Sequence, residues 1–317
     1  MHNPTKSTKS IKMNKSIAAN LRLACVSLSC LMLLSSNVLA DCKGMVLHAH
    51  RGDPNLPENS GRAIQSSLQG NWDGVEIDIQ QLRDRAWVIQ HDPVLGRTTS
   101  LALKRVQDLD SAMWQEIRLK DRKGNVTKEA APFLKEMLIQ AFDYPDKIIN
   151  AEIKQAYWGC DVAHNAVAEF NSARPNGNWF LTSIERGHLK CARQVDPQGY
   201  LGLIVLDKQA LARKDPRTAK HADRLAPPKI DRAWLQNLLR EVSLPVGIHI
   251  DTNTLDANSN LLSEAKALGI AVFTYNLMGD REHLRDLRTI RQRSGMWPSG
   301  AIIDGTSNAF CGELMRN

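Results

Sequence analysis

The chain has 317 residues, of which 43% are hydrophobic, and a formal net charge of +7 at pH 7. This length and composition suit one large domain with a packed core and exclude an intrinsically disordered protein. Aromatic residues make up only 5%, which disfavours a surface that stacks sugars or nucleic-acid bases. Five of the positive charges lie in residues 1–40, so the remainder carries about +2 and gives no indication of nucleic-acid binding.

Residues 1–40 are typical of a secretory signal peptide. They hold no acidic residue, an apolar run at Leu23–Leu34 that is too short to span a bilayer, and Ala40 at a suitable cleavage position. The basic residues of this segment are Lys6, Lys9, Lys12, Lys15 and Arg22. The alternatives are an uncleaved membrane anchor and a lipid-modified Cys42, which the preceding Asp41 disfavours. We therefore expect an exported protein, periplasmic or secreted, that keeps no stable membrane anchor after cleavage.

Short β-rich runs alternate with amphipathic segments through residues 41–317. Many runs are continuously apolar, such as Leu203–Leu206, which is typical of strands buried on both faces in a parallel sheet. The expected strands are Met45–His50, Gly74–Ile79, Trp87–His91, Ile148–Lys154, Trp179–Ser183, Gly199–Leu206, Pro245–Ile250, Ala271–Tyr275 and Ala301–Asp304. The expected helices include Phe133–Phe142, Asp161–Phe170, Arg232–Val242 and Leu261–Leu268. This alternation predicts a single (β/α)8 TIM-barrel domain.

An open doubly wound sheet is the alternative fold. No G-x-G-x-x-G follows the first expected strand, which disfavours the dinucleotide-binding version of that sheet. Residues 92–146 interrupt the alternation, because they contain no obvious strand. Their middle is interpreted as a small inserted region with some helix of its own, such as Ser111–Ile117.

Glu76 and Asp78 lie two residues apart in an otherwise apolar expected strand, so their carboxylates point to the same side. Two neighbouring carboxylates repel each other and lose hydration, and a divalent cation between them offsets both effects. The alternative is a pair of ordinary surface acids. The chain then turns near residues 83–85. A hairpin centred between residues 84 and 85 places His91 opposite Asp78.

His50 ends the first expected strand, and in a barrel such ends point into the catalytic mouth. Two imidazoles, His50 and His91, can accept and donate protons in phosphoryl transfer. A metal ion and Arg51 can neutralise charge on the phosphoryl oxygens. His48 shares a face with His50 but lies deeper in the expected strand, and we interpret it as structural or supporting.

Glu152 and Lys154 share a face of another buried strand. They can add a third carboxylate for the metal and a cation for the phosphate, and an internal salt bridge is the alternative. All-oxygen ligation by Glu76, Asp78 and Glu152 favours Ca²⁺ or Mg²⁺ without choosing between them.

Four cysteines follow residue 40, namely Cys42, Cys160, Cys191 and Cys311. An even number of cysteines in an exported chain predicts disulfides, and three pairings are possible. In a closed barrel the first and last strands are neighbours. We therefore favour Cys42–Cys311, which joins the two ends of the domain, together with Cys160–Cys191.

Together these motifs resemble the glycerophosphodiester phosphodiesterase family, in order and spacing, from about residue 45 to residue 155. The matching motifs are His50-Arg51-Gly52, Pro57-Glu58-Asn59-Ser60, Glu76-Ile77-Asp78, His91-Asp92 with Arg97-Thr98-Thr99, Pro132-Phe133-Leu134-Lys135-Glu136 and Glu152-Ile153-Lys154. The resemblance implies a distorted TIM barrel with a small inserted region after the His-Asp motif. It also implies one Ca²⁺ or Mg²⁺ ion held by the three carboxylates.

The same resemblance implies roles for the remaining site residues. His50 and His91 correspond to the acid–base pair, Arg51 and Lys154 to groups on the phosphate, and Glu58-Asn59 to positioning residues. The C-terminal half departs from the family, which usually has Trp-Thr-Val-Asn where this chain has Phe273–Asn276. The family's last strand usually ends in Thr-Asp with a Pro shortly after, and here the residues are Ile303-Asp304-Gly305. These positions are expected to line the alcohol side of the mouth, so the substrate is less defined than the chemistry.

The sequence therefore predicts a phosphoric diester hydrolase that converts glycerophosphodiesters, or similar small phosphodiesters, to a phosphomonoester and an alcohol. One alternative is a phospholipase-type barrel enzyme that acts on larger phospholipid head groups. An exposed apolar rim around the mouth would favour that enzyme, and a narrow polar mouth would favour small substrates. The other alternative is a non-catalytic protein that binds phosphorylated ligands.

Overall fold

The computed structural model describes residues 42–175 and 177–316. The predicted signal peptide, residues 1–40, lies outside the described residues, so its cleavage stays a prediction. Within the described ranges, no helix is both long enough and apolar enough to cross a membrane.

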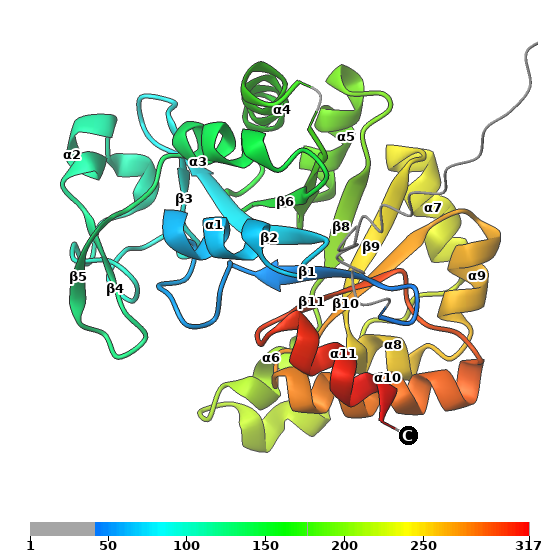
Figure 1. Ribbon diagram of the computed structural model, residues 1–317. Helices are drawn as coiled ribbons and strands as arrows, with labels where there is room; N and C mark the ends of the chain where they lie inside the picture. The colour runs from blue at the N-terminus through cyan, green and yellow to red at the C-terminus, as the bar shows by residue number, and fades with distance from the viewer. Residues whose placement is uncertain (1–41, 176, 317) are drawn as a thin grey trace, which may run out of the picture. The chain divides into compact units, whose positions relative to one another are not determined.

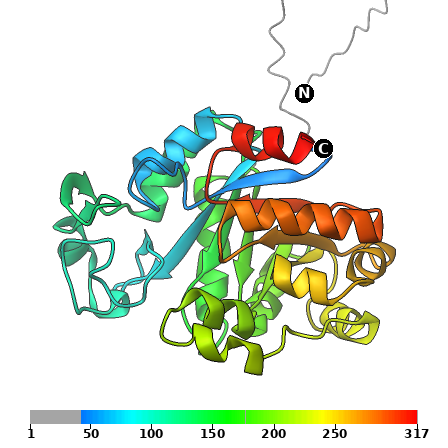
Figure 2. The same ribbon diagram turned by 90° about the horizontal axis from the view of Figure 1, so that it is seen from below.

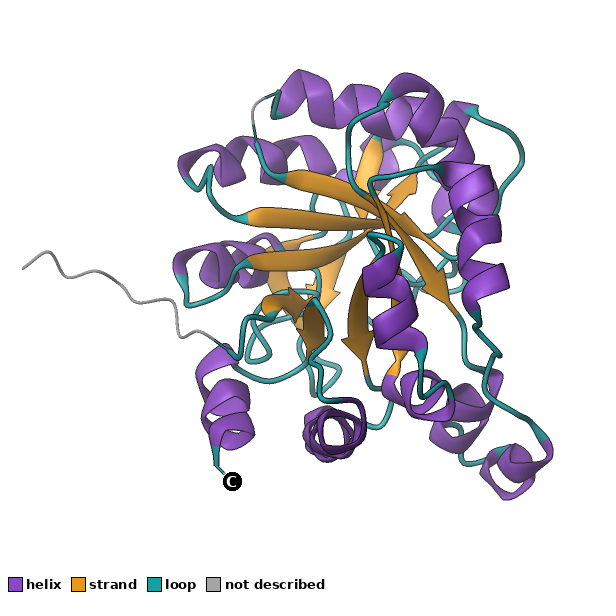
Figure 3. Cartoon of the chain, turned by 90° about the vertical axis from the view of Figure 1, so that its right-hand side faces the viewer, coloured by secondary structure: helices purple, strands orange, loops and turns teal. Residues whose placement is uncertain are grey.

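Eight parallel strands form a closed barrel (Figures 1 and 3). The strand order is β1-β11-β10-β9-β8-β7-β6-β2, and β1 also pairs with β2, which closes the ring. The strands are β1 (Val46–His50), β2 (Gly74–Gln81), β6 (Ile148–Ile153), β7 (Trp179–Ser183), β8 (Leu201–Val205), β9 (Val246–Asp251), β10 (Ala271–Tyr275) and β11 (Gly300–Ile303). The predicted TIM barrel is confirmed, and its strands lie within two residues of the predicted bounds.

Helices surround the barrel, as Figure 3 shows. An amphipathic helix of this layer buries one apolar stripe, and in α4 this stripe is Ala163, Ala166, Val167 and Phe170. The helices are α1 (Gly61–Gln69), α3 (Leu134–Gln140), α4 (Asp161–Ala173), α5 (Arg186–Val195), α6 (Lys208–Lys214), α7 (Arg232–Val242), α8 (Thr252–Ala257), α9 (Leu261–Ala267), α10 (Asp280–Ser294) and α11 (Ser307–Met315). Two short 3-10 helices, η2 (Ala141–Asp143) and η3 (Ala219–Arg224), complete the set.

The part of the interval 92–146 that precedes α3 leaves the barrel and forms a small lobe beside β3 (Trp87–Ile89) (Figures 1 and 2). The lobe contains η1 (Val106–Asp108), α2 (Ser111–Gln115), β4 (Arg118–Lys120) and β5 (Val126–Ala130). It packs around its own apolar cluster, which includes the fully buried Trp114.

The expectation that residues 92–146 contain no strand was wrong, because β4 and β5 pair in an antiparallel sheet. The residues of β5 alternate between exposed and half-buried, so no member is fully buried. The strand therefore lacks the apolar run that marked the barrel strands, and backbone pairing with β4 defines it instead.

The predicted hairpin exists, but its register differs by one residue. β2 and β3 pair with Ile79 opposite Ile89 and Gln80 opposite Val88, so the turn centres on residue 84. Gln90, and not His91, therefore faces Asp78, and the Gln90 amide donates to the Asp78 carbonyl at 2.8 Å. The turn contains Arg85 at φ 70° in place of a glycine, which removed the usual sequence signal for the register.

The barrel interior below the mouth is filled by rings set against glycines. His48, Phe180, His249 and Phe273 converge there, and His249 stacks on Phe273 with ring centroids 4.8 Å apart. A Cβ added to Gly202 would lie 2.6 Å from His249 Nε2, so only glycine leaves room for this ring. The structural interpretation of His48 agrees with this packing.

Both predicted disulfides are present. Cys42 is bonded to Cys311 of α11, with Cα atoms 5.3 Å apart, and Cys160 is bonded to Cys191 of α5, with Cα atoms 5.1 Å apart. The first bridge joins the two ends of the described domain. The second bridge ties the loop between β6 and α4 to the neighbouring helix α5.

Acid should destabilise this fold through three fully buried imidazoles. Burial lowers the pKa of His48, His249 and His283 to about 3, from 6.5 in an unfolded chain. Between those values the unfolded chain binds more protons, so the free energy of unfolding is intact above pH 6.5 and falls as the pH drops. At pH 5 the loss is up to about 2 kcal/mol for each imidazole.

Urea titrations at pH 7 and pH 5 measure this loss. We expect His249→Phe, which keeps a ring against Phe273 but cannot be protonated, to lose less stability than the parent chain between the two conditions. Equal losses in both proteins would contradict the assignment.

Candidate active site

The predicted site residues meet at the carboxyl ends of β1, β2 and β6. The parallel register places His50 of β1 beside Glu76 of β2, and Asp78 of β2 beside Glu152 of β6. Because these three strands are neighbours in the barrel, residues up to 102 positions apart in the chain form one cluster.

Three buried carboxylates form the centre of this cluster. Oxygens of Glu76, Asp78 and Glu152 lie within 4.8 Å of one another, and each residue is less than a tenth exposed. Hard divalent cations bind carboxylate oxygens at this kind of spacing, so the donor set fits Ca²⁺ or Mg²⁺.

Two cations neutralise part of this negative charge. Lys154 Nζ lies 2.7 Å from Glu152 Oε1 and 3.1 Å from Asp78 Oδ1. Arg51 Nε lies 3.1 Å from Asp78 Oδ2. The internal salt bridge that the sequence left open for Lys154 is therefore present, and it lies inside the carboxylate cluster.

The pKa values of two of the carboxyl groups, Glu76 and Asp78, shift in opposite directions. Burial, together with the nearby charge of Asp78, raises the pKa of Glu76 well above its usual value. Burial also acts to raise the pKa of Asp78, but Lys154 and Arg51 outweigh it and hold that pKa far below its usual range. Asp78 is therefore the fixed anion of the cluster, and Glu76 is the carboxyl group that most needs a further positive partner.

The loop after β1 is shaped to hold this arrangement. Arg51 and Asn59 both adopt left-handed backbone conformations, at φ 58° and 57°, and the Asn59 amide donates to the Arg51 carbonyl at 2.8 Å. Asn59 Nδ2 donates to Asp78 Oδ2 at 2.7 Å. Such backbone strain persists only where the surroundings enforce it, and the buried Asp78 carboxylate supplies that constraint. Glu58 accepts from Arg51 Nη1 at 3.1 Å.

His50 is oriented by Asp304, a residue that the sequence analysis expected at the alcohol side of the mouth but did not connect with His50. Its Nδ1 lies 2.5 Å from Asp304 Oδ1, and its Nε2 lies 4.0 Å from Glu76 Oε2. Asp304 follows β11, which is the other neighbour of β1 in the closed barrel. The sequence signal for this contact is an acidic residue directly after the last strand. It points to His50 only once the last strand is known to pair with β1.

His91 has a similar environment. Its Nδ1 lies 2.7 Å from Asp92 Oδ1, and Arg97 bridges Asp92 and Glu58 with contacts of 2.7 and 2.6 Å. Although the hairpin register differs from the prediction, His91 still lies close enough to contribute to the lowered pKa of Asp78, after Lys154 and Arg51. In both histidines a carboxylate binds Nδ1, which leaves Nε2 available at a half-buried ring.

The stretch Phe273–Asn276 does not line the mouth as a unit, contrary to the expectation. Phe273 lies in the ring-filled interior, and Thr274 Oγ1 is 2.9 Å from His283 Nε2 of α10. Asn276 Nδ2 donates to Thr252 and Asp286. Tyr275 lies near the acids of the mouth, since Glu152 contributes to its raised pKa after burial and Asp251.

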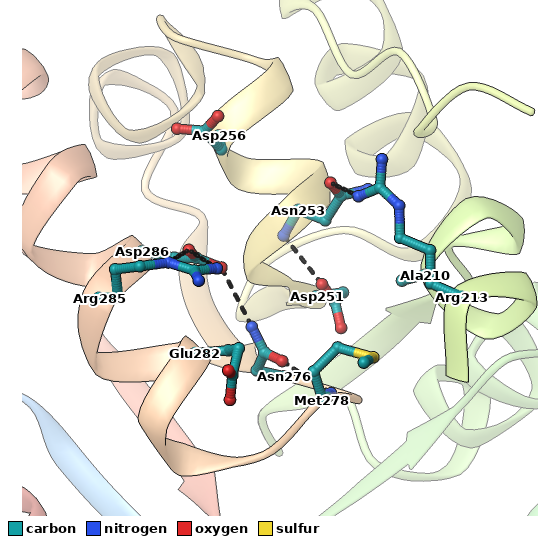
Figure 4. Close-up of a pocket in the computed structure, with 10 residues that line it drawn as sticks. All are labelled: Ala210, Arg213, Asp251, Asn253, Asp256, Asn276, Met278, Glu282, Arg285 and Asp286. Atoms are coloured by element: carbon teal, nitrogen blue, oxygen red, sulfur yellow. Dashed lines mark hydrogen bonds and ion pairs between the residues drawn. The ribbon is translucent and has the colours of Figure 1, made fainter. Parts of the chain in front are cut away.

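A small cavity of about 140 Å³ lies where β9 and β10 end (Figure 4). It contains none of the predicted site residues. Asp251, the most buried acid there, accepts from the backbone amides of Asn253 and Leu277, so both of its oxygens are bonded. These bonds, with those of Asn276, hold α8 and α10 in place, and we interpret this cavity as structural.

Residues 50–304 match the family described as "Glycerophosphoryl diester phosphodiesterase family". A glycerophosphodiester phosphodiesterase of Bacillus altitudinis is 26% identical over 51% of this chain and 66% of its own length. The enzyme of the same name from Caldanaerobacter subterraneus is 27% identical over 49% of this chain and 65% of its own length. The matches thus span slightly less than two thirds of these curated relatives.

Solved structures share the fold. A glycerophosphodiester phosphodiesterase structure from Parabacteroides distasonis is 15% identical with a TM-score of 0.62, and the match covers 82% of this chain and 93% of that chain. An Oleispira antarctica phosphodiesterase, in complex with the product sn-glycerol-3-phosphate, is 20% identical with a TM-score of 0.62 over 84% and 95% of the two chains.

The carboxylate cluster predicts that a hard divalent cation stabilises the folded chain. Ca²⁺ or Mg²⁺ at a hundredfold excess over its Kd should raise the free energy of unfolding by about 2.7 kcal/mol, because only the folded chain assembles the three ligands. Glu76→Gln should remove most of this gain. Thermal unfolding with and without each ion measures it, and Glu241→Gln, which alters an ion pair with Arg186 instead, is the control.

Proposed function

We propose that this chain, which belongs to the glycerophosphoryl diester phosphodiesterase family, hydrolyses glycerophosphodiesters or similar small phosphodiesters to a phosphomonoester and an alcohol. The observation that carries the proposal is the pair of imidazoles at the barrel mouth, each with an aspartate on Nδ1, which leaves Nε2 for proton transfer. The product-bound Oleispira antarctica phosphodiesterase of the same fold supports a small phosphodiester as the substrate.

The two histidines supply the proton transfers of this reaction. A carboxylate on Nδ1 fixes the ring orientation and stabilises the protonated ring, so one Nε2 can accept a proton while the other donates one. The attacking oxygen bonds to phosphorus after it loses its proton to one ring. The second ring protonates the alcohol oxygen as the P–O bond to it breaks.

Charge on the phosphoryl oxygens requires cations, and the site has several. We propose that Glu76, Asp78 and Glu152 hold one Ca²⁺ or Mg²⁺ ion, which when bound neutralises developing negative charge. Arg51 and Lys154 are proposed to bind the remaining phosphoryl oxygens. Both side chains already lie against Asp78, which holds their positive charges at the end of the barrel where the phosphate binds.

We also propose that the protein acts after export, in the periplasm or outside the cell. The predicted signal peptide and the two disulfides support this location, because disulfides persist in oxidising compartments. No nucleic-acid partner is proposed, since the charge of the chain beyond residue 40 is near neutral.

His50→Ala and His91→Ala should each lower kcat at least a hundredfold, because each variant removes one proton transfer. Release of glycerol 3-phosphate from glycerophosphocholine measures the activity, and EDTA should abolish it in the parent chain. The exposed His221 provides the control His221→Ala. Full activity in either active-site variant would refute the acid–base roles. If the parent chain and all variants are inactive, the alternative of a non-catalytic protein that binds phosphorylated ligands is favoured instead.

Asp304→Asn should lower kcat by about tenfold to a hundredfold while KM changes little, because the amide cannot stabilise a protonated His50. The pH profile of kcat should also shift, which a purely structural role for Asp304 would not cause. A parallel loss in KM and thermal stability, with an unchanged pH profile, would argue that Asp304 only supports the fold.

A further inference from the structure

Three exposed apolar side chains stand on the rim of the barrel mouth. Trp158 is 89% exposed, Ile184 is 42% exposed and Leu206 is 45% exposed. They follow the carboxyl ends of β6, β7 and β8, which are adjacent strands, so their loops are neighbours on the face that carries the active site. We call these three residues the apolar rim. Apolar side chains gathered on one face of a protein often mark a binding surface.

The loop that carries Trp158 is held firmly in place. The adjacent Tyr157 packs its ring on the start of α5, where a Cβ added to Gly187 would lie 2.7 Å from the ring, and it meets His188 edge-on at 5.5 Å. Two residues after Trp158, Cys160 is bonded to Cys191 of α5. The indole therefore faces solvent from a fixed loop, and exposure of so large an apolar group is unfavourable unless something covers it.

A cationic segment borders the apolar rim. Residues 208–229, which contain α6 and η3, carry seven Lys or Arg residues and two acidic residues. The hydrogen bond and the charge of His50 lower the pKa of Asp304 against the effect of burial, and Lys214 of this segment lies close enough to Asp304 to lower that pKa further. The segment therefore stands beside the active-site mouth. Leu211 and Leu225 are also exposed within it, so cationic and apolar groups share this surface.

We propose that the apolar rim and the cationic segment dock the mouth onto an anionic phospholipid surface. Tryptophan suits such an interface because its ring is apolar and its N–H is polar, and lysine and arginine attract anionic head groups. The charge complementarity favours a lipid surface over an apolar protein partner.

Vesicle binding tests the docking surface independently of activity. The parent chain should sediment with vesicles of phosphatidylglycerol and phosphatidylcholine, and Trp158→Ala should lower the partition coefficient about tenfold. Leu206→Ser is a second variant of the same surface. Phe142→Ala is the matched control, because Phe142 is 66% exposed and precedes β6, at the opposite end of the barrel. An unchanged thermal midpoint confirms that each variant is folded.

A parent chain that stays in the supernatant, or Trp158→Ala and Leu206→Ser variants that sediment as well as the parent chain, would overturn the inference. Neither outcome bears on the proposed function, because the sedimentation test does not measure hydrolysis.

Discussion

Three carboxylates buried within 4.8 Å of one another impose the constraint on which the mouth of this barrel depends. Such a cluster is tolerated in a folded protein only when positive charge reaches it. Lys154 and Arg51 supply part of that charge, and the strained loop after β1 places Arg51 and Asn59 where they can contact Asp78. Burial and the nearby charge of Asp78 keep the pKa of Glu76 raised, which makes the cluster receptive to a cation.

The sequence predicted the barrel well, because strands buried on both faces leave continuous apolar runs that short-range patterns reveal. It failed where structure depends on backbone pairing or on contacts across the chain. β5 has no fully buried residue, so its place in a sheet is visible only beside β4. The predicted hairpin register was wrong by one residue. Arg85 adopts a left-handed conformation there, and the sequence has no glycine to indicate it.

The two imidazole–aspartate pairs show the same limit within the active site. Asp92 neighbours His91 in the chain, and its motif was recognised directly. Asp304 lies 254 residues from His50, and only the closure of β11 on β1 brings them together. Below these pairs, rings packed against glycines fill the barrel, so the charged groups of the cluster lie at the mouth end of a packed interior.

The Cys42–Cys311 bridge gives the domain a covalent property that the fold alone lacks. It spans 269 positions of sequence and makes a ring of nearly everything that the structure describes. A single peptide-bond cleavage anywhere between these two cysteines leaves both pieces attached, since each retains one end of the bridge. In surroundings rich in proteases, cleavage of the exposed lobe between β3 and α3 would open the ring without releasing a fragment. The two segments would stay covalently joined through the disulfide.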